Sequence, residues 1–334
     1  MGGAYRLPCR GYGLARSRTL APMPATRAPC QPAALAVVTV AHHSAGVLCD
    51  LARDLASQRV VPTHWVVVDN SPLSQPVDLA KLRTDASSRA PMALQLLVGR
   101  EGDGFGAGCN RAMAWLEEQG WRGWVWLLNP DTALPRGDEL EELTQRLAEL
   151  APHSLVGTAV DDGTGALEAS GGWFTPGLRF RSRRLPSGGS GSEGPLRLDW
   201  LSGCSLALRP TAHHPSARFD PAFPLYYEDM DLCLRLGRLG APVMWLPSPR
   251  ITHRRGQGSG SSSPRRWRLS TVSYLRFLER HCPFWVVALR SLRLMVVSAV
   301  RLPLQPGRSW AVLAGALEVW RGGTTGQAPD RRQP

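Results

Sequence analysis

Three carboxylates, Glu228, Asp229 and Asp231, crowd four consecutive positions at the start of an apolar, periodic stretch. Leucines recur at 232, 236 and 239 and a glycine follows at 240, a spacing that predicts a helix whose acidic end comes first. One interpretation is capping of a surface helix, because negative charge is favourable at a helix N-terminus. The other is a general base at the mouth of a pocket. A glycosidase pair fits poorly, because adjacent residues at one helix start cannot flank a glycosidic bond.

Polar residues also follow several apolar, β-branched runs, at the point where each run ends. Asp69 follows the run at 65–68, and Asn129 and Asp131 follow the run at 124–128. Ligands of open α/β sheets bind beyond the carboxyl ends of the strands. We therefore expect these side chains to share one binding edge.

A glycine-rich segment, GDGFGAGCNR at 102–111, precedes a helical stretch. Glycine lets the backbone approach a ligand closely, and the start of the following helix can receive negative charge. A dinucleotide fingerprint is an alternative, because Gly102, Gly104 and Ala107 partly fit its spacing. It is disfavoured because the acidic ribose ligand expected about 20 residues further on would fall inside the apolar run at 124–128.

The composition narrows the class of protein. A formal net charge of +12 favours a partner that carries phosphate, such as an anionic membrane surface, a nucleotide or a nucleic acid. The seven cysteines are scattered singly, which favours neither a disulfide framework nor a zinc cage and fits a reducing cytosol. Residues 1–32 lack the apolar run of a secretory signal and are expected to form a disordered extension. No uncharged apolar run approaches the roughly 20 residues that span a bilayer.

Strand-like runs separated by helical segments dominate the first half of the chain and predict βαβ units in a mostly parallel sheet. They lie at residues 33–40, 65–68, 94–98 and 124–128, and a later short strand is expected at 243–246. We therefore expect an α/β domain over residues 33–255. A flexible Gly/Ser-rich loop at 256–264 and a basic, apolar helical tail at 265–334 are expected to follow.

Within this tail, residues 284–301 are expected to form an amphipathic helix. Its arginines at 290, 293 and 301 fall within an arc of roughly 80°, while most apolar residues lie elsewhere around the helix. The helix could pack on the core. Alternatively, it could lie at a membrane interface, with its basic side toward anionic headgroups and its apolar side toward acyl chains.

Seven short motifs occur in a characteristic order. They are VVVDNS at 66–71, GFGAGCN at 104–110, LLNPD at 127–131, WLSGC at 200–204, FD at 219–220, YEDMDLCLR at 227–235 and TH at 252–253. Together they resemble family 2 glycosyltransferases of the rhamnosyltransferase-like branch, over about residues 34–255. The resemblance implies a GT-A fold, in which a mostly parallel sheet is flanked by helices.

The resemblance also implies roles for the strand-end residues. The position of Asp69 accepts a hydrogen bond from the base of a nucleotide sugar, although an Asx turn is the structural alternative. The LLNPD motif occupies the place of the metal-binding DxD motif, so Asp131 would bind Mg²⁺ or Mn²⁺ bridging the diphosphate, and His253 would supply a further ligand. Because Asn129 replaces the first carboxylate, we expect weak metal binding without nucleotide.

For the acidic helix the resemblance implies that Asp229 is the catalytic base of an inverting transfer. Glu228 would position the acceptor or the helix, and Asp231 would cap the helix or pair with an arginine. The implied donor-binding positions are Asp69, Ala41, His42, Gly104, Phe105, Gly106, Gly108, Asn110, Asn129 and Asp131. The implied acceptor-side positions are Trp200, Gly203 and Glu228. His42 and His43 replace a Tyr-Asn pair often found after the first strand, which puts side-chain contacts to the nucleotide there in question.

The expected activity is transfer of rhamnose from dTDP-rhamnose to a saccharide or polyprenyl-diphosphate-linked acceptor in cell-surface polysaccharide or cell-wall synthesis. Galactofuranosyl, glucosyl or N-acetylhexosaminyl transfer are alternatives within the same family. We expect a cytoplasmic protein held peripherally at the inner face of the cytoplasmic membrane by its tail. A non-catalytic nucleotide-binding or nucleic-acid-binding module is disfavoured, and no nucleic-acid partner is expected, because no aromatic stacking platform with interleaved basic residues is visible.

Overall fold

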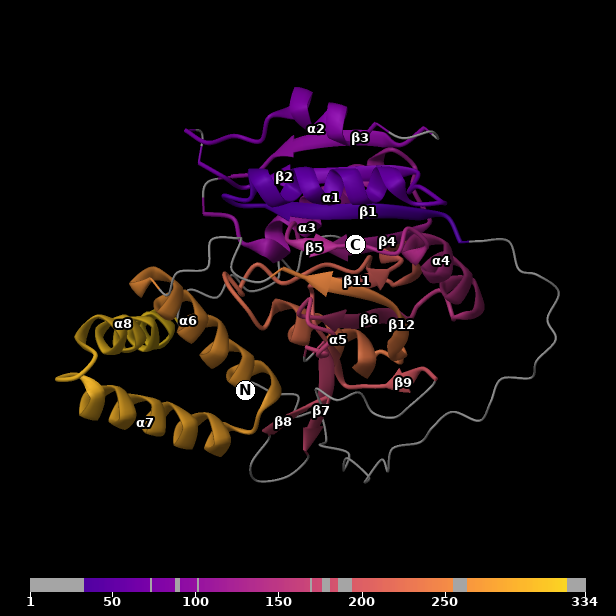
Figure 1. Cartoon of the computed structure of the whole chain (residues 1–334). Helices are drawn as coiled ribbons and strands as arrows, with labels where there is room; N and C mark the ends of the chain where they lie inside the picture. The colour runs from indigo at the N-terminus through magenta and orange to yellow at the C-terminus, as the bar shows by residue number, and fades with distance from the viewer. Residues whose placement is uncertain are drawn as a thin grey trace, which may run out of the picture.

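A computed structural model of the chain describes residues 33–72, 74–87, 91–100, 102–168, 170–175, 181–185, 194–254 and 263–322. The extension predicted at 1–32 and most of the loop predicted at 256–264 lie outside the described residues. Two β-sheets, helices on both faces of the larger one, and a group of three C-terminal helices make up the fold (Figure 1).

The larger sheet has nine strands, with the path β3-β2-β1-β4-β11-β6-β12-β5 and β9 beside β12. Its strands are β1 (Leu35–Ala41), β2 (His64–Asp69), β3 (Ala93–Val98), β4 (Trp124–Leu128), β5 (Thr132–Ala133), β6 (Leu155–Asp161), β9 (Leu196–Arg197), β11 (Ser205–Leu208) and β12 (Val243–His253). Pairing is parallel from β3 through β4 and between β6 and β12, whereas β11 runs antiparallel to both of its neighbours. The predicted α/β class with a mostly parallel sheet is confirmed.

The first strands are apolar on both faces because each face is covered by helices. The helices α1 (Ala45–Ser57), α2 (Leu79–Asp85) and α4 (Glu139–Glu149) share one core cluster with one face of β1, β2 and β4. The helices α3 (Phe105–Glu118) and α5 (Glu228–Arg238) share a second cluster with the other face. Two-sided burial explains the continuous β-branched runs.

A smaller antiparallel sheet joins β10 (Trp200–Leu201), β7 (Gly171–Thr175) and β8 (Arg181–Arg184). A 3₁₀ turn at Pro210–Ala212 follows β11. The last long strand, β12, runs further than the predicted segment at 243–246. Its pairing with β6 shifts between Leu246 and Arg250, where Pro247 and Pro249 interrupt the apolar pattern. The strand resumes beyond this irregularity and carries His253 to its end.

The C-terminal helices are α6 (Pro264–His281), α7 (Phe284–Arg301) and α8 (Pro306–Gly322), which gather on one side of the main sheet (Figure 1). Helix α6 packs on α8 through a small apolar cluster that includes Val272, Leu275 and Val319. Helix α6 also contacts the segment that leads into α5: Ser273 Oγ accepts from the Leu225 N–H at 3.2 Å, and Arg276 donates to the Ala222 carbonyl at 2.6 Å. None of the described helices is long and apolar enough to cross a membrane.

Candidate active site

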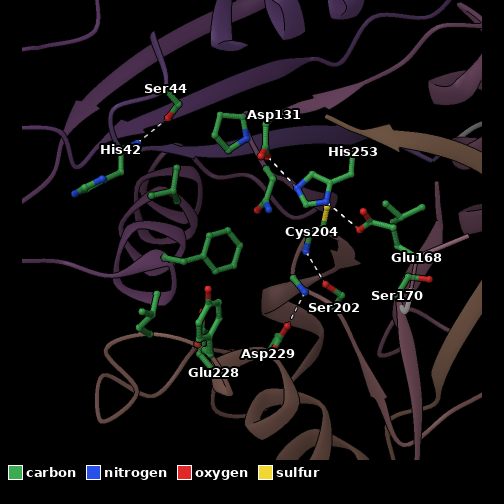
Figure 2. A pocket seen from close by; sticks show the side chains of 18 of the residues that line it. His42, Ser44, Asp131, Glu168, Ser170, Ser202, Cys204, Glu228, Asp229 and His253 are labelled. Atoms are coloured by element: carbon green, nitrogen blue, oxygen red, sulfur yellow. Dashed lines mark hydrogen bonds and ion pairs between the residues drawn. The ribbon is translucent and has the colours of Figure 1, made fainter. Parts of the chain in front are cut away.

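A cavity of about 630 Å³ opens beyond the carboxyl ends of β1 and β4 (Figure 2). It brings together predicted site residues that lie far apart in the sequence, namely His42, Phe105, Asn129, Asp131, Gly203, Glu228, Asp229 and His253. Figure 2 shows Glu228 and Asp229 on the opposite side of this cavity from Asp131 and His253. The site therefore has two chemically different walls.

The acidic wall is the start of α5, and two tyrosines place it there. Tyr226 and Tyr227 both adopt positive φ angles, 65° and 68°, a left-handed conformation that costs a non-glycine residue on the order of 1–3 kcal/mol. The ring of Tyr227 lies 5.8 Å from that of Tyr274 and 5.3 Å from that of Phe277, both on α6. Packing against α6 thus holds the turn that presents Glu228 and Asp229 to the cavity.

The two adjacent carboxylates have different partners. One Asp229 oxygen accepts from the Gly203 N–H at 2.8 Å, and the other accepts from the Met230 N–H at 2.7 Å. Glu228 is buried, with 7% of its surface exposed, and its Oε2 has no hydrogen-bond partner among the described residues. Because backbone donors stabilise a charged carboxylate, the negative charge of the pair resides on Asp229.

Electrostatics separate the two groups in the same way. Burial, reinforced by the neighbouring Asp229, raises the pKa of Glu228 to about 8. Burial also raises the pKa of Asp229, while the N–H groups of Gly203 and Met230 favour its charged form. Glu228 therefore keeps a proton that it can donate in a hydrogen bond, while the two backbone donors favour the carboxylate form of Asp229.

The third acid of the helix, Asp231, does not line the cavity. Its side chain is fully buried and accepts from Arg235 Nε at 2.6 Å and from His281 Nε2 at 2.8 Å. Arg280 lies 3.4 Å from the same carboxylate and also pairs with Asp220. Of the two predicted roles for Asp231, pairing with an arginine is the one observed. The burial of Asp231 and its contact with a histidine of α6 were not foreseen.

The opposite wall centres on His253 at the end of β12. Its Nε2 lies 3.3 Å from Asp131 Oδ1, and its Nδ1 lies 3.0 Å from Glu168 Oε2 (Figure 2). Burial disfavours the charged imidazole, but hydrogen bonds to Asp131 and Glu168 outweigh it and raise the pKa of His253. Glu168 fixes the orientation of the ring, as outer carboxylates do for metal-binding histidines.

The donor chemistry of this wall fits a divalent cation. Asp131 offers a carboxylate oxygen and His253 offers Nε2, both facing the cavity, while Glu168 holds the far side of the ring. Within the described part of the chain, no group of three or more His, Cys, Asp or Glu side chains converges to hold a metal. A cation here would therefore need further oxygen ligands from a bound diphosphate or from water.

Other predicted donor-binding residues make structural contacts. Asp69 is buried and accepts from the Ser71 N–H at 2.9 Å and the Val77 N–H at 2.6 Å, so the Asx turn is present. Asn110 exchanges two hydrogen bonds of 2.8 Å with the backbone of Phe219. Neither side chain lines the cavity.

Close packing accounts for several of the predicted glycines. A Cβ on Gly106 would lie 2.9 Å from Phe219, and one on Gly108 would lie 2.7 Å from Val40. Gly104 caps the start of α3. Ala41 and Trp200 are buried, and neither of them, nor any of these three glycines, lines the cavity. In this structure the glycine-rich segment lets α3 pack closely against Phe219 and Val40.

Two ionisable residues of the cavity wall, Glu168 and Arg266, were not predicted from the sequence. Glu168 stands in a loop segment without any motif, and only its contact with His253 reveals it. Arg266 comes from the first turn of α6, lines the cavity and hydrogen-bonds Tyr226. The Pro-Arg-Arg run at 264–266, just after the Gly/Ser-rich loop, was the available signal for a cation near the site.

No protein-family model matches the chain. The chain is 27% identical over 217 residues, 56% of its length and 67% of the relative's, to a Mycobacterium tuberculosis (strain CDC 1551 / Oshkosh) protein described as N-acetylglucosaminyl-diphospho-decaprenol L-rhamnosyltransferase. The structure of GalNAc-T7 with UDP, GalNAc and Mn²⁺ aligns with a TM-score of 0.53 at 14% identity, covering 90% of this chain and 58% of that one. The mannosyltransferase PcManGT from Pyrobaculum calidifontis, in complex with GDP-Man and Mn²⁺, aligns with a TM-score of 0.49 at 16% identity, covering 90% and 78%.

The sheet with its cavity at the strand ends is a GT-A fold, and the chain is a glycosyltransferase. Its sequence is similar to that of a rhamnosyltransferase, in agreement with the predicted likeness to the rhamnosyltransferase-like branch of family 2.

The protonated state of Glu228 predicts a pH-dependent stability difference. In the unfolded chain a glutamate ionises near pH 4.5, but in the fold Glu228 keeps its proton to about pH 8. Between these values the unfolded state binds fewer protons, so the wild type loses up to about 1.4 kcal/mol of stability per pH unit as pH rises. Glu228→Gln has no proton to lose. The melting temperature of this variant, relative to that of the wild type, should therefore rise as the pH increases from 5 to 8.

Thermal unfolding of both proteins across this range measures the difference. Glu118→Gln, at an exposed glutamate on α3, is the matched control. A Glu228→Gln difference that stays constant between pH 5 and pH 8 would contradict the buried, protonated Glu228.

Proposed function

We propose that this chain is an inverting glycosyltransferase that moves a sugar from a nucleoside diphosphate donor to a lipid-linked saccharide. The observation that carries the proposal is the opposition of the two walls, with Asp229 and Glu228 facing Asp131 and His253 across one cavity (Figure 2). An inverting displacement needs a base on the face opposite the leaving group. The acidic wall supplies the base, and the metal-compatible wall suits a diphosphate.

In this mechanism Asp229 takes the proton of the acceptor hydroxyl as its oxygen attacks the anomeric carbon. The Gly203 and Met230 N–H groups fix the carboxylate of Asp229. Neutral Glu228 can donate a hydrogen bond to the acceptor, which would give its Oε2 a partner. In this proposal Asp229 removes the proton and Glu228 positions the acceptor.

On the donor side, Asp131 and His253 would hold Mg²⁺ or Mn²⁺, and Glu168 would orient the histidine. A bound divalent cation neutralises charge that develops on a departing diphosphate. Arg266 lines the same cavity and is placed to add a guanidinium to the phosphate contacts. Asp69 and Asn110 would influence nucleotide binding indirectly, by fixing the backbone segments with which they form hydrogen bonds.

The relative's described activity, L-rhamnosyl transfer to a decaprenyl-diphosphate-linked sugar, supports rhamnose from dTDP-rhamnose as the donor and a polyprenyl-diphosphate-linked saccharide as the acceptor. Galactofuranose, glucose and N-acetylhexosamine donors remain the alternatives. A role in cell-wall or surface polysaccharide synthesis follows from that acceptor class.

We further propose that the C-terminal helices rest on the cytoplasmic membrane surface. Five apolar residues of α7 form an exposed stripe, here called the apolar band: Trp285, Leu289, Leu292, Val296 and Val300, with exposures from 38% to 71%. Helix α7 carries no acidic residue, and exposed arginines at 293 and 301 flank the band. Apolar surface rimmed by cations suits an anionic bilayer.

Removal of the proposed base tests the reaction. Asp229→Asn should lower the transfer rate by about 10²–10⁴-fold while nucleotide affinity persists, because the amide cannot accept the proton. Product formation and nucleotide titration measure the two effects, with Asp162→Asn, at an exposed aspartate, as the control. Transfer at the wild-type rate would refute the assignment, and absence of transfer in the wild type would favour a non-catalytic nucleotide-binding module.

The metal proposal concerns nucleotide affinity. In the wild type, Mn²⁺ should tighten nucleoside diphosphate binding, and Asp131→Ala should abolish this gain because it removes the carboxylate ligand. Glu168→Gln should reduce the gain by about 10–100-fold, as loss of an outer hydrogen-bond partner does. Titrations with and without Mn²⁺ measure it. Equal wild-type affinities in both conditions would count against a metal.

The membrane proposal is tested with the double variant Leu289→Glu, Val296→Glu. Its binding to vesicles of phosphatidylglycerol and phosphatidylcholine should weaken by about tenfold per substitution, since each change removes an apolar side chain that the bilayer would bury. The control carries Val98→Glu and Leu239→Glu, which are 68% and 75% exposed outside the tail. Equal sedimentation of both variants with the vesicles would refute the role of the band.

A further inference from the structure

A second cavity, of about 560 Å³, lies among the three C-terminal helices, apart from the candidate active site. Its wall is mostly apolar and includes Glu279, Cys282, Phe284, Ala288, Leu292 and Trp320. The volume falls within the range of about 300–1,000 Å³ typical of small-molecule sites. An apolar wall of this kind gains most from a hydrocarbon ligand.

This cavity is continuous with the apolar band. Leu292 belongs to both, and Phe284 and Trp320 also line the cavity while remaining 86% and 48% exposed. A contiguous exposed apolar patch, unlike a single exposed side chain, marks a site of contact with a membrane, a ligand or another protein. Leu292 therefore joins the apolar band to the wall of the cavity.

Arg290 of α7 lies next in sequence to the wall residue Ser291 and hydrogen-bonds the Tyr274 hydroxyl of α6 at 3.4 Å. Burial raises the pKa of the Cys282 thiol, which lies in the cavity wall, to about 11, and the guanidinium groups of Arg290 and Arg238 oppose this rise. The acidic residue of the wall, Glu279, has Arg276 near enough to counter the effect of burial on its pKa. Two arginines beside an apolar cavity complement a chain that carries a diphosphate headgroup.

The position of Arg238 relates this wall to the site of transfer. Arg238 ends α5 and Asp229 lies in its first turn, so the two are separated by about 14 Å along the helix axis. That span is on the scale of a monosaccharide joined to a diphosphate. One helix therefore carries the proposed base at one end and, at the other, an arginine whose charge acts on the Cys282 thiol of the second cavity.

We propose that this cavity binds the isoprenoid chain of the lipid-linked acceptor, with Arg238 and Arg290 beside its diphosphate. The inference rests on the proposed function, because it assigns the lipid part of that acceptor to a site. The cavity would select acceptors by their chain and hold the sugar within reach of Asp229.

A binding experiment on the full chain tests the site independently of transfer. Farnesyl diphosphate should bind the wild type more tightly than inorganic diphosphate in calorimetric titrations. This gain in affinity is the contribution of the isoprenoid chain. Ala288→Trp, which fills the cavity, should reduce the gain by at least about tenfold, the effect of withdrawing roughly two buried methylenes. Ala299→Trp, at an exposed α7 alanine outside the cavity, should keep the gain.

Leu292→Gln provides a second cavity variant in case Ala288→Trp does not fold, as judged by circular dichroism. An equal gain in the wild type and the cavity variants would overturn the proposal. Loss of the wild-type gain in the presence of phosphatidylglycerol vesicles would assign the cavity to an acyl chain and would also overturn it.

Kinetics separate this inference from the proposed function. Sugar diphosphates with a citronellyl or a methyl group as the lipid part should both accept sugar, with the lower KM for the citronellyl compound. Ala288→Trp should remove that difference with little change in kcat. Transfer to both compounds with equal KM in the wild type would refute the cavity alone, whereas absence of transfer to either would refute the proposed function.

Discussion

The buried carboxylate of Asp231 is the interaction on which the arrangement of the site depends. It has no solvent exposure and is held by Arg235 of its own helix and by Arg280 and His281 of α6. A buried carboxylate is tolerated only when it is paired, and removal of one partner leaves an uncompensated charge. The contact therefore fastens α5 to α6, and with it the first turn that carries Glu228 and Asp229.

The same attachment explains how the protein tolerates a strained entry to α5. Two successive tyrosines in the left-handed region are unfavourable, yet Tyr227 packs on rings of α6, and Arg276 of α6 binds the loop backbone at Ala222. The C-terminal helices are in this sense part of the active site. They hold the acidic wall, contribute Arg266 to the cavity and carry the apolar band beyond it.

Much of the fold could be predicted from the sequence. Strands buried on both faces produce continuous β-branched runs, and the apolar residues of α4 and α5 recur at helical spacing. The run at 124–128 matches β4, and the segment at 284–301 matches α7. The packing role of α6 was missed, because ion pairs between Asp231 and residues about 50 positions later leave no local pattern. Glu168 was missed for the same reason. Motif order singled out Asp131, His253 and Asp229, which line the cavity, but it could not distinguish them from Asp69, which makes an Asx turn and does not line it.

We propose that the opposed walls of the cavity carry out an inverting transfer from a nucleotide sugar. The most direct measurement is NMR analysis of the wild-type product formed from a panel of nucleotide sugars, a sugar diphosphate lipid acceptor and Mn²⁺. The account predicts one donor, dTDP-rhamnose first among them, that yields nucleoside diphosphate and glycosylated acceptor in equal amounts, with inverted anomeric configuration. A product that retains the donor's configuration, or nucleotide-sugar binding without any product across the panel, would contradict it.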